Sequence, residues 1–265
     1  MLDKMIIGRY VPANSLMHKM DPRAKLLLVF LFVCVVFLAN NVVSYGLLAV
    51  FTILLISLSK IPLRYLYNGL KPIFFLIVFT FLLHILFTKE GELLFEYGWF
   101  EIYEGGLIQG FFISIRFTLL ILVTSLLTLT TSPISITDGM EELLGPLKKW
   151  KMPVHELALM MSIALRFIPT LMEETEKIMK AQTARGVDFS SGPLKDRVKS
   201  IVPLLVPLFV SSFKRAEELA TAMESRGYRG GEGRTKYRQL NWKTSDSLLM
   251  VSIGVLTVML FLLRS

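Results

Sequence analysis

Long uninterrupted runs of apolar residues constrain the fold of this chain more than any other feature of its sequence. A helix needs about 20 mostly apolar residues to cross the hydrocarbon core of a membrane. Five runs approach or reach that length, at 26–39, 42–58, 73–87, 105–130 and 248–263. Hydrophobic residues make up 53% of the 265 residues and charged residues only 19%, which is unlike a soluble domain of this size. The sequence therefore predicts an all-α, polytopic membrane protein with about five transmembrane helices.

The basic residues are concentrated between the fourth and fifth runs. Of the 29 Lys and Arg residues, 18 lie between Lys148 and Lys243, whereas the segment 88–104 has one Lys and five Glu. Cationic residues gather in cytoplasmic loops, so this distribution predicts a cytoplasmic N-terminus and a cytoplasmic insert. It also explains the net charge of +8 without a nucleic-acid partner. We expect a membrane domain of about four spans (1–130), a cytoplasmic domain (131–243) and a final span (244–265).

The insert has the pattern of long amphipathic helices. After a short helix at 138–144, a helical pattern runs from Val154 to about Arg185. A turn is predicted at 190–193, then a second helix to about Arg226, then a flexible polar linker at 229–234. The other helix, the membrane or a partner could cover the apolar faces of these helices. On the second helix the predicted apolar face comprises Leu205, Phe209, Phe213, Ala216, Leu219, Ala220 and Met223.

The two predicted helices end in matching sequences. Ala184-Arg185-Gly186 ends the first and Ser225-Arg226-Gly227 ends the second, 41 residues further on. Either one alone is explained as a helix stop, because Gly adopts the left-handed conformation and Arg complements the negative end of the helix dipole. A stop does not explain the repetition. A small residue before Arg permits close backbone approach, and a guanidinium can bind a carboxylate through two hydrogen bonds. The pair therefore indicates docking onto two related subunits.

Two other positions carry polar residues of interest. Arg116 lies near the middle of the fourth run, and Gln109 lies seven residues earlier on the same helical face. An Arg within a membrane costs about 2.5–3.5 kcal/mol on insertion scales, so Arg116 is expected to face protein. It either holds a neighbouring helix or partner, or extends to the membrane surface. Before the first run, Asp21 and Pro22 predict a helix start, with Arg23 and Lys25 at the membrane surface.

No motif for catalysis or cofactor binding is present in the sequence. It lacks the Gly-rich loop that holds nucleotide phosphates, and it lacks the common zinc-protease and serine-hydrolase motifs. The three His residues do not cluster, and His84 in the third run is interpreted as an interior group with a satisfied hydrogen bond. We expect no catalytic residue, no metal site and no cofactor bound by this chain.

Several stretches together resemble a known family, the transmembrane T component of energy-coupling factor transporters (EcfT or CbiQ-like proteins). Ser225 stands where Ala is typical of that family, which keeps a small residue before Arg226. The matching stretches extend across nearly the whole chain: Gly8-Arg9-Tyr10 through His18, Asp21-Pro22-Arg23-Ala24-Lys25, Ala164-Leu165-Arg166-Phe167-Ile168-Pro169, Ala181-Gln182-Thr183-Ala184-Arg185-Gly186 and Ala222-Met223-Glu224-Ser225-Arg226-Gly227-Tyr228.

The resemblance implies a non-catalytic scaffold of an ATP-driven importer for vitamins or metal ions. Two ATP-binding-cassette ATPases, EcfA and EcfA′, would bind the ATP and receive the ends at 184–186 and 225–227 on the cytoplasmic side. A separate membrane protein, the S component, would bind the transported substrate. The two long helices would be coupling helices that transmit the movement of the ATPases to the S component.

Two other functions remain open for a helical membrane protein of this kind. An intramembrane enzyme would need polar groups that converge within the bilayer, and the sequence offers few. A self-contained secondary transporter would show repeated halves with broken helices at matching positions, and these spans are not symmetric. Only the T-component interpretation predicts that two ATPases co-purify with the chain.

Overall fold

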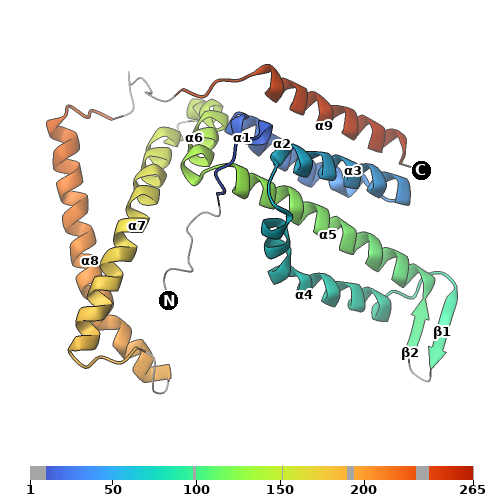
Figure 1. The fold of residues 1–265 in the computed structure, drawn as a ribbon, viewed down its shortest axis with the longest axis horizontal. Helices are drawn as coiled ribbons and strands as arrows, with labels where there is room; N and C mark the ends of the chain where they lie inside the picture. The colour runs from blue at the N-terminus through green and yellow to red at the C-terminus, as the bar shows by residue number, and fades with distance from the viewer. Residues whose placement is uncertain (1–9, 98–99, 151, 190–193, 231–238, 265) are drawn as a thin grey trace. The chain divides into compact units, whose positions relative to one another are not determined.

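The computed structural model describes residues 10–97, 100–150, 152–189, 194–230 and 239–264 (Figure 1). Gly8, Arg9, the predicted turn at 190–193 and the linker residues 231–234 lie outside the described residues. Helices dominate the described chain: α1 (Leu16–Lys19), α2 (Pro22–Val35), the 3₁₀ helix η2 (Val36–Leu38), α3 (Val42–Ser59), α4 (Leu63–Phe87), α5 (Glu104–Thr130), α6 (Pro133–Leu143), the 3₁₀ helix η3 (Gly145–Trp150), α7 (Val154–Ala184), α8 (Leu194–Ser225) and α9 (Thr244–Leu262).

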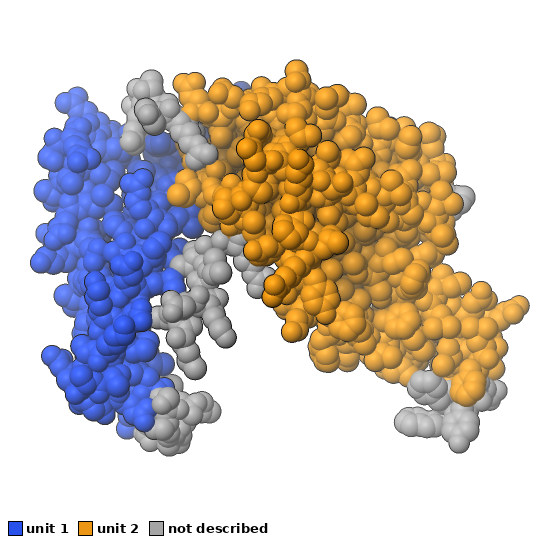
Figure 2. Space-filling view, viewed as in Figure 1, with its two compact units in different colours: residues 1–5, 144–238 blue, residues 6–143, 239–265 orange. Residues whose placement is uncertain are grey.

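The chain divides into two compact units, which Figure 2 shows in different colours. Within the described residues, unit 1 covers 144–230 and unit 2 covers 10–143 and 239–264. The cytoplasmic domain expected from the sequence is 131–243, and the contacts within the structure group 131–143 and 239–243 with unit 2. The reason for α6 is its close packing on α2: a Cβ atom added to Gly139 would lie 3.1 Å from the Cβ atom of Pro22.

Helices α2 and α3 of unit 2 each begin after a residue whose side chain caps the helix. The carboxylate of Asp21 accepts a hydrogen bond from the backbone N–H of Arg23 at 2.9 Å, and Pro22 opens α2, which confirms the predicted start. Asn41 caps α3 through a reciprocal pair of hydrogen bonds with Ser44. These caps satisfy N–H groups that the first turn of a helix leaves free. The caps therefore define where α2 and α3 begin.

The core of unit 2 lies between α2, α3, α5 and α9. It is made of branched aliphatic and aromatic side chains that are almost fully buried: Leu28, Phe32, Leu48, Leu55, Val123, Leu126, Ile253 and Leu260. The described residues include only one sheet, the two-stranded antiparallel hairpin of β1 (Leu93–Tyr97) and β2 (Phe100–Tyr103), within the Glu-rich segment 88–104. The predicted all-α fold is confirmed.

Five of the described helices are long and apolar enough to cross a membrane, which are α3, α4, α5, α7 and α9. The number agrees with the sequence-based count, but the set differs. The first predicted run, 26–39, lies in α2 and η2 and is not among the five. Helix α2 has 14 residues, which is too short to cross a membrane, and η2 ends before Asn40 and Asn41. Conversely, α7 qualifies because its charged residues are concentrated after Pro169, which leaves an apolar first half.

Helices α4 and α5 pack closely because small residues line their contact. A Cβ atom added to Gly106 would lie 2.9 Å from the carbonyl oxygen of His84, and one added to Gly110 would lie 3.0 Å from a ring carbon of Phe81. Small residues allow the backbones of membrane helices to approach each other in this way. The pairing of β1 with β2, in which Leu93 lies opposite Tyr103, completes the connection between the two helices.

Unit 1 consists mainly of α7 and α8, which run antiparallel and cross (Figure 1). The side-chain amide of Gln182, near the end of α7, donates to the carbonyl of Pro203 at 3.1 Å. In the middle of the pair, Arg215 donates to the carboxylate of Glu174 at 2.8 Å. Further along, Phe167 and Met223 line the same hollow. Residues later in α7 therefore contact residues earlier in α8, which is the order expected for an antiparallel pair.

Candidate functional site: two arginine-capped helix ends

The end of α7 is a complete glycine-terminated cap. Arg185 is the C-cap residue, and Gly186 follows with a φ of 89°, in the left-handed region. The N–H of Gly186 donates to the carbonyl of Thr183 at 2.9 Å, and that of Val187 donates to the carbonyl of Gln182 at 3.0 Å. This pair of hydrogen bonds is the Schellman motif, and it requires a residue that tolerates positive φ.

The end of α8 repeats that geometry bond for bond. Gly227 has a φ of 78°. Its N–H donates to the carbonyl of Glu224 at 2.9 Å, and the N–H of Tyr228 donates to the carbonyl of Met223 at 3.0 Å. The helix-stop explanation therefore holds for both glycines. In this explanation each arginine complements the negative end of its helix dipole, and the hydrogen bonds of the cap do not use its guanidinium group.

Both arginine side chains are exposed. Within the part of the chain that the structure describes, neither Arg185 nor Arg226 has a hydrogen bond or ion pair through its guanidinium. Ala184 and Ser225 are exposed as well, and the hydroxyl of Ser225 donates back to its own helix, to the carbonyl of Ala222 at 3.0 Å. The surroundings of both glycines are open. Each helix therefore presents a cation on a small-residue surface that a partner backbone can approach.

The two ends lie at opposite ends of the antiparallel pair. Gln182, close to Arg185, contacts Pro203, and Arg226 follows 23 residues further along α8. At a rise of about 1.5 Å per residue, that length of helix separates the two ends by about 35 Å. At this separation the two guanidinium groups cannot bind the same carboxylate.

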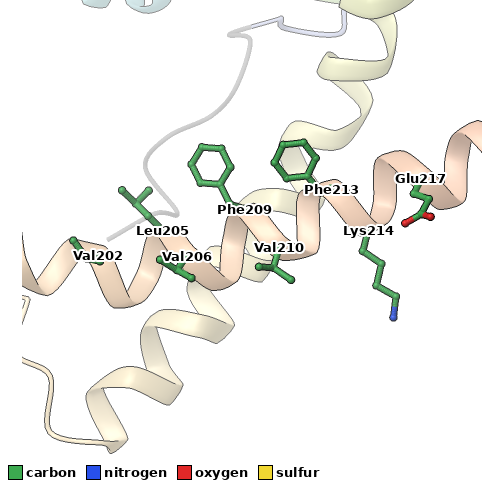
Figure 3. A pocket seen from close by; sticks show the side chains of 8 residues that line it. All are labelled: Val202, Leu205, Val206, Phe209, Val210, Phe213, Lys214 and Glu217. Carbon is green, nitrogen blue, oxygen red and sulfur yellow. The ribbon is translucent and has the colours of Figure 1, made fainter.

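The predicted apolar face of α8 divides into two parts. Its later residues, from Ala216 to Met223, face α7 around a hollow of about 330 Å³. Its earlier residues line an open groove of about 730 Å³, and Figure 3 shows them along one helix: Val202, Leu205, Val206, Phe209, Val210, Phe213, Lys214 and Glu217. Phe209 is 60% exposed and Phe213 is 71% exposed. We call the apolar residues of this groove, from Val202 to Phe213, the α8 strip.

The sequence interpretation missed a buried polar cluster at the start of α2. We expected Lys25 at the membrane surface, but it is 3% exposed. Its ammonium donates to the carbonyl of Thr130 at 3.1 Å and to the hydroxyl of Thr131 at 3.0 Å, because α5 ends beside it and leaves a carbonyl free. The spacing of Asp21 and Lys25, one helical turn apart, was the available signal.

Asp21 and Asp246 complete this cluster. The backbone N–H of Asp21 donates to the carboxylate of Asp246 at 3.0 Å, and Asp246 is fully buried. Burial by itself raises the pKa of Asp21, but hydrogen bonds and charge from Arg23, with the charge of Lys25, outweigh it and leave the pKa below its ordinary value. The start of α2 is thus bound to the start of α9 by charged groups.

Arg116 and Gln109 have different partners. The guanidinium of Arg116 donates to the carbonyl of Ala39 at 3.2 Å and lies 5.2 Å from the ring centroid of Phe37 and 5.8 Å from that of Tyr45. The amide of Gln109 donates to the carboxylate of Glu90 at 2.7 Å. The structure therefore does not bring the two residues together, although they share a helical face. Arg116 contacts the end of η2, on a neighbouring part of the bundle.

The remaining candidates do not form a reactive centre within the described residues. The Nδ1 atom of His84 pairs with the carbonyl of Thr80 at 2.8 Å, within its own helix. Across the described ranges, no group of three or more His, Cys, Asp or Glu residues is placed to hold a metal ion. Among the described residues, the two arginine-capped ends and the α8 strip are left as exposed features to which the interactions above assign no role.

Taken together, these features define a multi-pass helical membrane protein with a two-helix unit that carries matched cationic ends. Comparison with known families then shows the family to which the chain belongs. The family CbiQ, described as cobalt transport protein, matches residues 13–237, and the chain belongs to this family.

Individual relatives match over the full length of the chain. The energy-coupling factor transporter transmembrane protein EcfT of Bacillus subtilis is 68% identical over 265 residues, which is 100% of both chains. EcfT of Listeria innocua is 56% identical over 265 residues, again 100% of both, and EcfT of Streptococcus equi is 51% identical over 100% of this chain and 98% of its own. The chain is thus related to transmembrane components of energy-coupling factor transporters, which are transport proteins.

Proposed function

We propose that this protein is the coupling subunit of an ATP-driven importer, in which two ATP-binding-cassette ATPases bind the ends of α7 and α8. The observation that carries the proposal is the pair of identical caps with exposed arginines about 35 Å apart. Exposed cations with geometric freedom are suited to bidentate binding of a carboxylate on a partner. Two matched ends suit two related partners.

The α8 strip supports a second contact in the same complex, with the S component. Large apolar side chains in a continuous exposed strip mark an interaction surface when they are not isolated. Among the described residues nothing covers Phe209 and Phe213 within unit 1. We place the S component on this strip, so that movement of the helix ends changes the position of the strip and reorients the bound S component.

The same proposal assigns the chemistry to the partners. ATP would be bound and hydrolysed by the ATPases, and the S component would bind the vitamin or metal ion. In this arrangement the chain itself holds no cofactor and has no catalytic residue. The basic insert, with unit 1, would lie on the cytoplasmic side because the cytoplasmic loops of membrane proteins carry the excess of Lys and Arg.

The relatives disfavour the two alternatives. Those that match over the whole chain are named as transmembrane components of an energy-coupling factor transporter. A self-contained secondary transporter leaves the matched caps and the α8 strip without a role.

Charge reversal at each helix end tests the proposal. Arg185→Glu and Arg226→Glu each place a carboxylate where the partner groove is expected to carry one, and like charges in a desolvated contact cost several kcal/mol. Each variant should insert normally, lose one ATPase on purification and lose substrate uptake. The double variant should lose both ATPases.

Arg229→Glu is the matched control, because it makes the same charge change three residues beyond Arg226 on an exposed side chain. It should retain both ATPases. If Arg185→Glu and Arg226→Glu each co-purify both ATPases and import substrate at wild-type rates, the docking assignment is wrong.

A further inference from the structure

Arg23 lies beside both connections that flank α7 and α8. Unit 2 runs to residue 143 before these helices and resumes at residue 239 after them. Within unit 2, the Nη1 atom of Arg23 donates to the carboxylate of Glu142 at 3.2 Å, one residue before the first connection. Its Nη2 atom donates to the carbonyl of Leu240 at 3.4 Å, just after the second. One side chain therefore contacts the chain at both places.

The position of this guanidinium is fixed by its neighbours. Nε and Nη2 both donate to the carboxylate of Asp21, at 3.0 Å each, which is a bidentate arrangement. The side chain of Asp21 is fully buried and that of Arg23 is 20% exposed, so the pair is shielded from water. Asp21 is itself bound through its backbone to Asp246 at the start of α9. The charged cluster described above thus holds Arg23 in one orientation.

An aromatic ring completes the contact on the returning segment. The guanidinium carbon of Arg23 lies 5.8 Å from the ring centroid of Trp242, within the range of a cation–π interaction. The indole N–H of Trp242 donates to the hydroxyl of Ser247 at 2.9 Å, which orients the ring. The guanidinium therefore uses its edge for Asp21, Glu142 and Leu240 and its face for Trp242.

We propose that Arg23 is a positioning residue that holds the two connections at a fixed separation. Movement imposed on the ends of α7 and α8 then reaches unit 2 as one displacement, and is not absorbed by independent movement of the two connections. The transport consequence rests on the coupling function proposed above. The fixed separation itself is a property of this chain alone.

The separation can be measured directly with spin labels in unit 2. Labels on Met140→Cys in α6 and Gln239→Cys, in a chain that carries Cys34→Ala, report the distance between the two connections by pulsed electron resonance. Both labelled positions are exposed. We expect a narrow distance distribution in the parent chain and a broad one in Arg23→Gln. Arg23→Lys should broaden it as well, because an ammonium cannot reproduce the planar fork.

Energy coupling is the second readout, measured on the complete transporter with its ATPases and S component. In Arg23→Gln both ATPases should co-purify in wild-type amounts and ATP hydrolysis should continue. The number of ATP molecules hydrolysed per substrate imported should rise by about fivefold, since losing a charge-assisted contact shifts an equilibrium by at least that factor. A purely structural loss would reduce the amount of complex and leave this ratio unchanged.

Arg64→Gln is the control, an exposed arginine of α4 whose side chain has no hydrogen bond or ion pair among the described residues. It should change neither readout. If Arg23→Gln does not accumulate, Glu142→Gln and Trp242→Leu each remove one contact and should each broaden the distribution in part. An unchanged distribution in Arg23→Gln, or in both partner variants, overturns the proposal, and so does full rescue by Arg23→Lys. If the parent chain retains no ATPase, the coupling function fails, while the label distances still decide the role of Arg23.

Discussion

Glu174 on α7 and Arg215 on α8 are joined by a hydrogen-bonded ion pair of 2.8 Å at the middle of the two-helix unit. Ser211, one turn earlier on α8, donates to the same carboxylate. The side chains of Glu174 and Arg215 are 21% and 37% exposed, so the pair is partly shielded from water. Because the proposed coupling requires α7 and α8 to move together, this junction is a place where the mechanical integrity of unit 1 can be tested.

Glu174→Ala should weaken the crossing of the two helices. It removes the acceptor of two hydrogen bonds and leaves the guanidinium of Arg215, whose Nε atom is already buried without a partner, with less compensation. Loss of hydrogen bonds to a charged group costs about 1.5–3 kcal/mol. The free energy of unfolding, measured by denaturant titration in detergent, should fall by an amount in this range.

Lys180→Gln is the matched control for that measurement. Lys180 pairs with Glu176 at 3.1 Å on the exposed side of α7, four residues away on the same helix. Exposed pairs of this kind contribute about 0.3–0.5 kcal/mol. Equal effects of Glu174→Ala and Lys180→Gln would show that the crossing does not depend on the pair.

Alanine at the two cap glycines should loosen the helix ends. Gly186 and Gly227 have positive φ, and nothing lies within 4 Å of an added Cβ atom at either position. The whole cost is therefore backbone strain, about 1–2 kcal/mol for a left-handed residue with a Cβ atom. In the Gly186→Ala variant, the amide hydrogens of residues 186 and 187 should exchange about tenfold faster than in the parent chain, since about 1.4 kcal/mol corresponds to a factor of ten.

Gly254→Ala separates strain from the mere addition of a methyl group. Gly254 lies inside α9, also has nothing within 4 Å of an added Cβ atom, and does not have positive φ. Replacing a mid-helix Gly by Ala should stabilise the protein by about 0.5–1 kcal/mol. If Gly186→Ala behaves like Gly254→Ala, the left-handed cap is not needed in solution.

His18 should make stability depend on pH. Burial lowers its pKa, the hydrogen bond from Nε2 to the carbonyl of Val11 opposes that shift, and the charge of Lys25 adds to it. The folded state thus favours neutral His18, and the unfolded state, with a pKa of about 6.5, binds more protons below that pH. The stabilisation is present above about pH 6.5 and is lost as the pH falls through the lower pKa of the folded state.

The measurement compares denaturant titrations at several pH values. The parent chain should lose free energy of unfolding as the pH is lowered from 7.5, and His18→Gln should lose less over the same interval. The side-chain amide nitrogen of Gln lies near the position of the His Nε2 atom, so it keeps a donor for the carbonyl of Val11 but does not titrate. Identical pH profiles of the two chains would exclude His18 as the titrating group.

The sequence predicted features that depend on neighbouring residues in the chain. The caps at Asp21, Gly186 and Gly227 follow from short motifs whose geometry is local. The same holds for the helical character of the long apolar and amphipathic segments. In the candidate site, the open, unpaired state of Arg185 and Arg226 agrees with their interpretation as ends, and their docking role stays a prediction.

What the sequence did not predict depends on contacts between distant segments. Lys25 is buried by contact with the end of α5, 105 residues away in the sequence, and Asp21 is hydrogen-bonded to Asp246, 225 residues away. The apolar face of α8 is exposed along the α8 strip and packed on α7 in its later part, and the boundary between the two parts depends on where the helices cross. Periodicity gives a face of one helix and carries no information on which length of that face is covered.

Arg116 should hold α5 against the hairpin of α2 and α3. Its guanidinium binds the carbonyl of Ala39 at the end of η2, where the negative end of a helix favours a cation, and it lies over Phe37 and Tyr45. Arg116→Gln shortens the side chain and removes the charge, so the hydrogen bond and both ring contacts are lost. We expect the free energy of unfolding to fall by about 1–3 kcal/mol.

Gln109→Ala is the matched control for Arg116→Gln. Gln109 lies seven residues before Arg116 on α5, and its side chain makes an exposed hydrogen bond with Glu90. Removing that hydrogen bond should lower the free energy of unfolding by less than about 1 kcal/mol. An equal or larger loss in Gln109→Ala would mean that this face of α5 is anchored through Glu90, and that Arg116 does not hold the hairpin.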